Sequence, residues 1–127
     1  WDNEELFYKG TEDWEAPKVG ASCPPLETDD GWLLIYHGVK ADDQMYRIGI
    51  LLLDKDDPRK IIGKTKDFIM EPDLPYERAG GLYDGCVFPT GAVIKDDTLY
   101  VYYGCADKYV SVATANIKEV LNELKNK

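Results

Sequence analysis

The sequence predicts an all-β fold with one short α-helix at its C-terminal end. Runs of β-branched and aromatic residues, bounded by Gly, Pro or Asp pairs, follow one another along most of the chain. An Asp-Asp pair followed by an aromatic run occurs twice. Only the last segment has its apolar residues at helical spacing. We therefore expect a repeated antiparallel unit followed by a helix.

The expected strands are separated by turn signals and by one long loop. The strands are predicted at 32–37, 46–53, 60–64, 86–94, 98–103 and 109–115. The second ends before Pro58, because proline cannot donate to a strand ladder. The stretch 71–85 contains two prolines and a Gly-Gly pair and is predicted to be a loop.

The segment from Asp29 to Gly38 can be aligned with the segment from Asp96 to Gly104. Each begins with an Asp-Asp hairpin turn and continues as an aromatic strand that ends near a glycine. The copies are roughly 65 residues apart, more than the 40 to 50 of a usual propeller blade, and the long loop accounts for the excess. Two such units predict about two blades of a β-propeller. Two blades leave strand edges unpaired, so we expect them to be part of a longer protein.

The repeat divides the chain into four parts. We assign 1–19 to the end of a preceding blade and a linker, 20–70 to one blade, 71–115 to the last blade, and 116–127 to the helix. In the helix, residues 117, 120, 121 and 124 are apolar, the i, i+3, i+4, i+7 pattern. Asn116 is a suitable N-cap.

The net charge of −9 argues against nucleic acid as a partner, because phosphate backbones bind clustered Lys and Arg. It also means that an anion site must be built from a few local donors. The sequence has no apolar run of about 18 residues, so we expect no membrane span.

The cysteines Cys23, Cys86 and Cys105 are odd in number and widely spaced. A disulfide framework favours an even number, and a metal site favours close pairs. We expect three buried thiols and a cytoplasmic protein.

Three residues are candidates for site chemistry. Lys18 precedes Val-Gly-Ala, where small residues would let an anion approach the backbone, although composition alone favours a solvated loop lysine. His37, the only histidine, ends an aromatic strand and could donate to a phosphate or a sugar hydroxyl, or be structural. Asp107 follows a Tyr-Tyr-Gly-Cys-Ala run, as in sugar sites, but could simply form a turn. We find no nucleophile triad, phosphate-binding Gly loop or metal cluster, and expect no metal or organic cofactor.

An ordered series of short strings resembles glycoside hydrolase family 130, the β-mannoside phosphorylase family. It runs from about Trp14 to Ala115. The strings are Trp14-Glu15, Lys18-Val19-Gly20-Ala21, Pro24-Pro25-Leu26, Gly31-Trp32-Leu33-Leu34-Ile35-Tyr36-His37-Gly38-Val39, Tyr46-Arg47, Leu51-Leu52-Leu53-Asp54, Asp57-Pro58, Tyr76-Glu77, Val87-Phe88-Pro89 and Tyr102-Tyr103-Gly104-Cys105-Ala106-Asp107.

The resemblance implies a five-bladed β-propeller with a central active site, in which inorganic phosphate breaks a β-mannoside and yields α-mannose 1-phosphate with inversion. It implies that Lys18 and His37 bind phosphate. It also implies that Asp107, Tyr46 and Tyr103 contact the sugar substrate. The family's catalytic Asp and its phosphate-binding arginines match no residue here and are expected upstream of Trp1, in blades that the active protein requires. We therefore expect this chain alone to be inactive.

Two alternatives to the phosphorylase remain open. One is a β-mannoside hydrolase of the same family, since some members lack the phosphate-binding basic residues. The other is a non-catalytic carbohydrate-binding remnant whose open edges are covered by a partner or by a second copy in a homo-oligomer.

Overall fold

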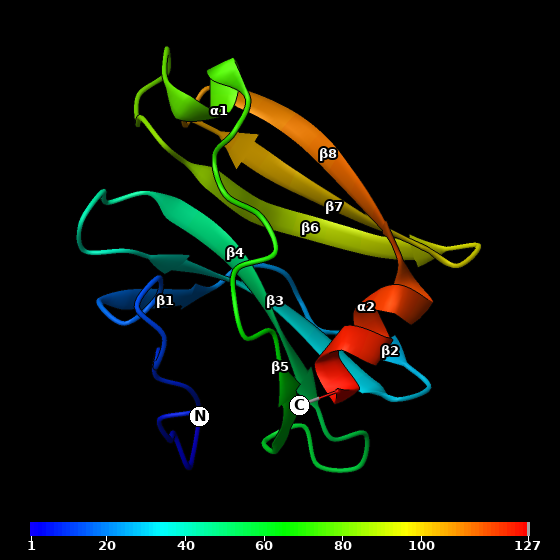
Figure 1. Ribbon diagram of the computed structural model, residues 1–127. Coiled ribbons are helices and arrows are strands. Elements are labelled where there is room, and N and C mark those ends of the chain that lie inside the picture. The colour runs from blue at the N-terminus through cyan, green and yellow to red at the C-terminus, as the bar shows by residue number, and fades with distance from the viewer. Residues whose placement is uncertain (127) are drawn as a thin grey trace.

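The computed structural model describes residues 1–126, which form two antiparallel sheets and two helices (Figure 1). The first sheet contains β1 (Lys18–Ala21), β2 (Leu26–Thr28), β3 (Gly31–Val39), β4 (Tyr46–Leu53) and β5 (Ile61–Lys64), in the order β1-β3-β4-β5, with β2 also pairing with β3. The second contains β6 (Val87–Lys95), β7 (Thr98–Cys105) and β8 (Tyr109–Asn116) in sequence order. The helices are α1 (Pro75–Arg78) and α2 (Ile117–Lys125).

The predicted two-sheet organisation and C-terminal helix are confirmed. Each predicted strand is present, and its ends lie within two residues of the expected ones. Sequence reasoning missed β1, β2 and the single turn of α1, which lies inside the predicted loop. These elements are too short to show a periodic pattern. The first sheet begins at Lys18, and the division of the chain into blades stays a prediction.

Two local predictions are also confirmed. Asp96 and Asp97 have φ of 50° and 61°, the left-handed conformation of a two-residue hairpin turn, and they join the paired residues Lys95 and Thr98. The side chain of Asn116 accepts from the backbone N–H groups of the first turn of α2, at 2.9 and 3.3 Å.

The two sheets lie one above the other in Figure 1, and they meet where the start of β4 approaches the start of β6. Tyr46 and Cys86 form a parallel bridge there. Within residues 1–126 it is the only backbone bridge between the two sheets. The sheets do not close into a ring. Along the described chain β8 pairs only with β7, so its outer edge is open. The number of propeller blades stays a prediction.

The main core lies between the sheets and beneath α2. The first sheet contributes Leu33, Ile35, Ile48 and Ile50, and the second contributes Val87, Leu99, Val101 and Cys105, while α2 contributes Ile117, Leu121 and Leu124. A smaller cluster of Trp14, Tyr36, Leu51 and Leu53 covers the other face of the first sheet. The first sheet is therefore buried on both faces, which explains its long apolar strands.

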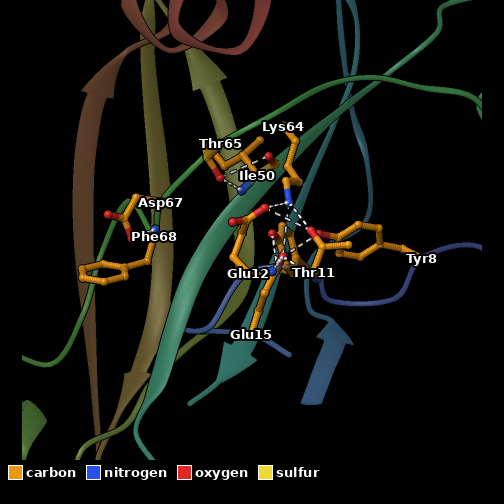
Figure 2. A network of polar contacts seen from close by, with 10 residues as sticks. Tyr8, Thr11, Glu12, Glu15, Ile50, Lys64, Thr65, Asp67 and Phe68 are labelled. Carbon is orange, nitrogen blue, oxygen red and sulfur yellow. Dashed lines mark hydrogen bonds and ion pairs between the residues drawn. The ribbon is translucent and has the colours of Figure 1, made fainter. Parts of the chain in front are cut away.

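A buried carboxylate attaches the N-terminal segment to this second face (Figure 2). Glu15 is fully buried, and its Oε2 accepts from the Tyr36 hydroxyl at 2.6 Å. Its Oε1 accepts from the Tyr8 hydroxyl at 2.7 Å. Lys64 of β5 lies 3.4 Å from the same carboxylate. Burial alone would raise the pKa of Glu15, but the hydrogen bonds from Tyr36 and Tyr8 outweigh it and lower the pKa. The carboxylate is therefore charged and fully partnered.

The same arrangement recurs in the second unit. Glu77 is buried, and its Oε2 accepts from the Tyr103 hydroxyl at 2.6 Å. In both units the glutamate Oε1 also accepts from the backbone N–H groups three and four residues earlier. Tyr36 is the sixth residue after Asp30, and Tyr103 is the sixth after Asp97. The internal repeat thus extends from the sequence to a shared Glu–Tyr contact.

We predict that Tyr36→Phe lowers the free energy of unfolding by about 1 to 3 kcal/mol, because a buried charged acceptor loses a donor. Tyr102→Phe is the matched control, since Tyr102 is 44% exposed, and it should change stability by less than about 0.5 kcal/mol. Urea denaturation of both variants measures the difference. Equal losses would contradict a special role for the Glu15 contact.

Candidate functional site

Three of the predicted site residues lie on one face of the first sheet because of its strand register. Lys18 of β1 is opposite Val39 of β3, and Val39 is opposite Tyr46 of β4. In the neighbouring row on the same face, Gly20 is opposite His37. Side chains of directly opposed residues point to the same face, and this face recurs every second residue. Lys18, His37 and Tyr46 are therefore brought together, and we call these three residues the Lys18 group.

Lys18 and Tyr46 are in direct contact. The Lys18 Nζ donates to the Tyr46 hydroxyl at 2.7 Å and lies 4.9 Å from the centre of its ring. The lysine side chain is exposed, and this hydrogen bond raises its pKa. The ammonium group is thus charged, held at one place on the surface, and open to an incoming anion.

His37 is held within a tight aromatic and backbone environment. Its side chain is 5% exposed, and its ring centre lies 4.4 Å from that of Phe88 and 5.4 Å from that of Tyr46. A Cβ atom on Gly20 would lie 2.5 Å from the imidazole, so only glycine fits below the ring. The Nδ1 atom is 2.8 Å from the Ser22 hydroxyl.

The imidazole is uncharged at neutral pH. Burial, followed by the nearby positive charge of Lys18, lowers the pKa of His37 from 6.5 to about 4. A neutral imidazole offers one N–H donor and one acceptor nitrogen. His37 can therefore serve an anion as a hydrogen-bond donor but not as a second cation.

Tyr83, from the long loop, extends the aromatic surface. Its ring stands edge-on to Tyr46 at 5.2 Å, and its hydroxyl donates to the Gln44 carbonyl at 2.7 Å. Together with Phe88, these rings form a wall beside Lys18. Such a wall suits the apolar face of a sugar ring.

Asp107 lies near the group but not in contact with it. It is exposed in the turn between β7 and β8, with φ of 54°. Burial, with a contribution from the Asp107 charge, raises the pKa of Cys86 to about 12, and the Lys18 charge opposes this. Both charges thus act on one buried thiol. Within residues 1–126, Asp107 and Lys18 form no ion pair.

Tyr103 lies outside the group. It is 2% exposed and bonded to Glu77, because alternate residues of β7 face the core and position 103 is one of them. This placement gives no support to a sugar contact, and the predicted role stays a prediction. The neighbouring Tyr102 faces solvent instead.

Sequence reasoning missed Gly20, Ser22, Tyr83 and Phe88. Lys18, Gly20 and Ser22 are spaced two residues apart. Had a strand been predicted here, this spacing would have placed all three on the face that contains His37. Tyr83 and Phe88 reach the site through the long loop and the start of β6. No local pattern marks those positions.

A separate groove of about 310 Å³ lies between the sheets and α2. Its walls are mainly apolar, and its charged residues are Glu119 and Glu123. An anion would be repelled there, so the groove does not compete with the Lys18 group as a phosphate site.

In the part of the chain that the structure describes, no helix is long and apolar enough to cross a membrane.

We predict that an NMR titration of His37 gives a pKa near 4. Lys18→Met should move this pKa upward, because one of the two causes of the shift is removed. Lys95→Met, at the far end of β6, is the control and should leave it unchanged. A wild-type pKa of 6 or more would contradict the buried position of the ring.

The same shift predicts a pH dependence of stability. Between pH 6.5 and about 4, the unfolded chain binds a proton at His37 and the folded chain does not. The free energy of unfolding should therefore fall as the pH drops through this range, by an amount on the order of 1 to 3 kcal/mol. Chemical denaturation at several pH values should show this component in the wild type and not in His37→Gln.

Comparison with known proteins identifies the family of the chain. Residues 3–126 match the model of glycoside hydrolase family 130, described as beta-1,4-mannooligosaccharide phosphorylase. The chain is 42% identical over 120 residues to a 1,2-beta-oligomannan phosphorylase of Thermoanaerobacter sp., covering 94% of this chain and 40% of that protein. It is 47% identical over 107 residues to a beta-1,2-mannobiose phosphorylase of the same organism, covering 84% of this chain and 35% of that protein.

Solved structures give the same result. The fold matches the beta-1,2-mannobiose phosphorylase of Listeria innocua in complex with beta-1,2-mannobiose, with a TM-score of 0.85, 35% identity, and coverage of 94% of this chain and 33% of that one. It also matches, with a TM-score of 0.77 and 29% identity, a structure from work on family hydrolases that target beta-1,2 mannosidic linkages in Candida mannan, covering 91% of this chain and 34% of that one. This chain therefore spans well under half the length of these relatives. It belongs to glycoside hydrolase family 130.

Proposed function

We propose that the complete protein containing this chain is a phosphorylase of β-mannosides, and that this chain supplies part of its phosphate site and its sugar site. One observation carries the proposal: a charged Lys18, a neutral His37 and the Tyr46 hydroxyl converge beside an aromatic wall. The chain has a net charge of −9, so an anion needs a local set of hydrogen-bond donors, and these residues provide one. The related proteins include phosphorylases of 1,2- and 1,4-linked mannosides.

Each residue has a role that its surroundings suit. Lys18 gives phosphate a charge-assisted hydrogen bond, and His37 gives it a neutral one. Binding of phosphate would exchange the Lys18–Tyr46 hydrogen bond for contacts with the anion. The rings of Tyr46, Tyr83 and Phe88 cover one face of the sugar, and Asp107 accepts from its hydroxyl groups.

The reaction is a displacement with inversion. A phosphate oxygen forms a bond to the anomeric carbon while the bond from that carbon to the glycosidic oxygen breaks. The leaving oxygen takes a proton from a carboxylic acid that we expect outside this chain. The products are α-mannose 1-phosphate and the shortened saccharide. Because the nucleophile enters opposite the leaving group, the Lys18 group must lie across the sugar from that acid.

A hydrolase is the second candidate, since one matched structure comes from work on family hydrolases. A hydrolase would need water in place of phosphate and would have no use for a lysine held beside a neutral imidazole. The presence of both Lys18 and His37 favours the phosphorylase.

The location of the protein is also a proposal. Cys23, Cys86 and Cys105 are buried free thiols in the described part of the chain. Unpaired thiols fit a reducing compartment, and we place the protein in the cytoplasm on this ground.

The proposal predicts that the complete protein releases mannose 1-phosphate from β-1,2- or β-1,4-mannobiose only when phosphate is present. Lys18→Met should lower kcat/KM for phosphate by about 10- to 100-fold, the effect of losing one charge-assisted hydrogen bond. Lys95→Met removes the same charge from an exposed hairpin and should have no effect. Release of free mannose at equal rates with and without phosphate would indicate the hydrolase. Saccharide binding without cleavage would indicate the binding remnant.

A further inference from the structure

We infer that Ser22 is a positioning residue that holds His37 in the tautomer with its proton on Nε2, so that His37 presents a donor to phosphate. The inference rests on the proposed function for its purpose. Its structural basis is independent of that function: the Ser22 Oγ lies 2.8 Å from His37 Nδ1.

The direction of this hydrogen bond follows from the atoms available. A serine hydroxyl carries one proton, and a neutral imidazole has one bare nitrogen. If Ser22 donates to Nδ1, both groups are satisfied at once and the imidazole proton is on Nε2. If Nδ1 donates instead, the half-buried Ser22 hydroxyl has to turn its proton to solvent and the Nε2 lone pair is left without a protein donor. The first arrangement leaves fewer unpartnered groups.

The ring itself has little freedom, so the proton position is what Ser22 determines. Gly20 lies directly below the imidazole, and the Phe88 ring lies beside it, tilted by 37°, with a centre distance of 4.4 Å. These contacts fix the plane of the ring but say nothing about which nitrogen is protonated. Ser22 comes directly after Ala21, the last residue of β1, and its hydroxyl lies 2.8 Å from Nδ1.

The tautomer matters because phosphate oxygens mostly accept hydrogen bonds. With its proton on Nε2, His37 adds a donor beside the Lys18 ammonium. With its proton on Nδ1, His37 would present a lone pair toward the anion and weaken binding. A hydroxyl next to the imidazole thus decides whether His37 helps or opposes phosphate.

Nitrogen-15 NMR of the complete protein, labelled at histidine and held at pH 7.5, tests the tautomer directly. The His37 signals are identified by their loss in His37→Gln. We expect Nε2 protonated and Nδ1 bare in the wild type and in Ser22→Thr, which keeps the hydroxyl. Ser22→Ala should give a mixture of tautomers. Ser111→Ala, the same change at the chain's other serine, should match the wild type. A proton on Nδ1 in the wild type, or an unchanged tautomer in Ser22→Ala, overturns the inference.

Phosphate kinetics test the consequence. Ser22→Ala should raise KM for phosphate about tenfold, with little change in KM for the mannoside, and Ser22→Thr should restore most of the loss. If the tautomer changes but phosphate KM does not, the positioning role is wrong. If the wild type cleaves no mannoside, the proposed function fails, and the NMR result still decides the tautomer. Circular dichroism of each variant checks that it is folded.

Discussion

The antiparallel register of β1, β3 and β4 is the constraint on which the site depends. It places Lys18, Val39 and Tyr46 in one row and Gly20, His37 and Ile48 in the next. A slip of one residue would move Lys18 or His37 to the opposite face of the sheet, away from its partners. The register is well specified, because both faces of this sheet are buried. Packing of an ordinary core thus fixes the geometry of a polar site.

Comparison of the two repeat units distinguishes residues that stabilise the fold from residues that form the site. Both units keep a buried glutamate bonded to a strand tyrosine, Glu15 with Tyr36 and Glu77 with Tyr103. The residue after each tyrosine differs: it is His37 in one unit and Gly104 in the other. The shared contact is therefore structural, and the imidazole is present in one copy only. This explains how Tyr103 can lie in a family string and still face the core.

Much of the fold was predictable, because it depends on local patterns. Alternation, turn residues and the 3.6-residue period predicted the main strands, the Asp96-Asp97 turn and α2. For the site, Lys18, His37 and Tyr46 were identified, but their contacts were not. The hydrogen bond between Ser22 and His37 and the aromatic wall join segments far apart in the sequence. Such contacts are set by tertiary packing, and single-sequence patterns do not contain them.

A crystal structure of the complete protein with bound phosphate tests the central claim most directly. The account predicts a phosphate whose oxygens lie within about 3.2 Å of the Lys18 Nζ and the His37 Nε2. It also predicts that the Lys18–Tyr46 hydrogen bond of 2.7 Å is lengthened or broken. A phosphate bound at another place in the active cleft, with Lys18 still bonded to Tyr46, would contradict the account.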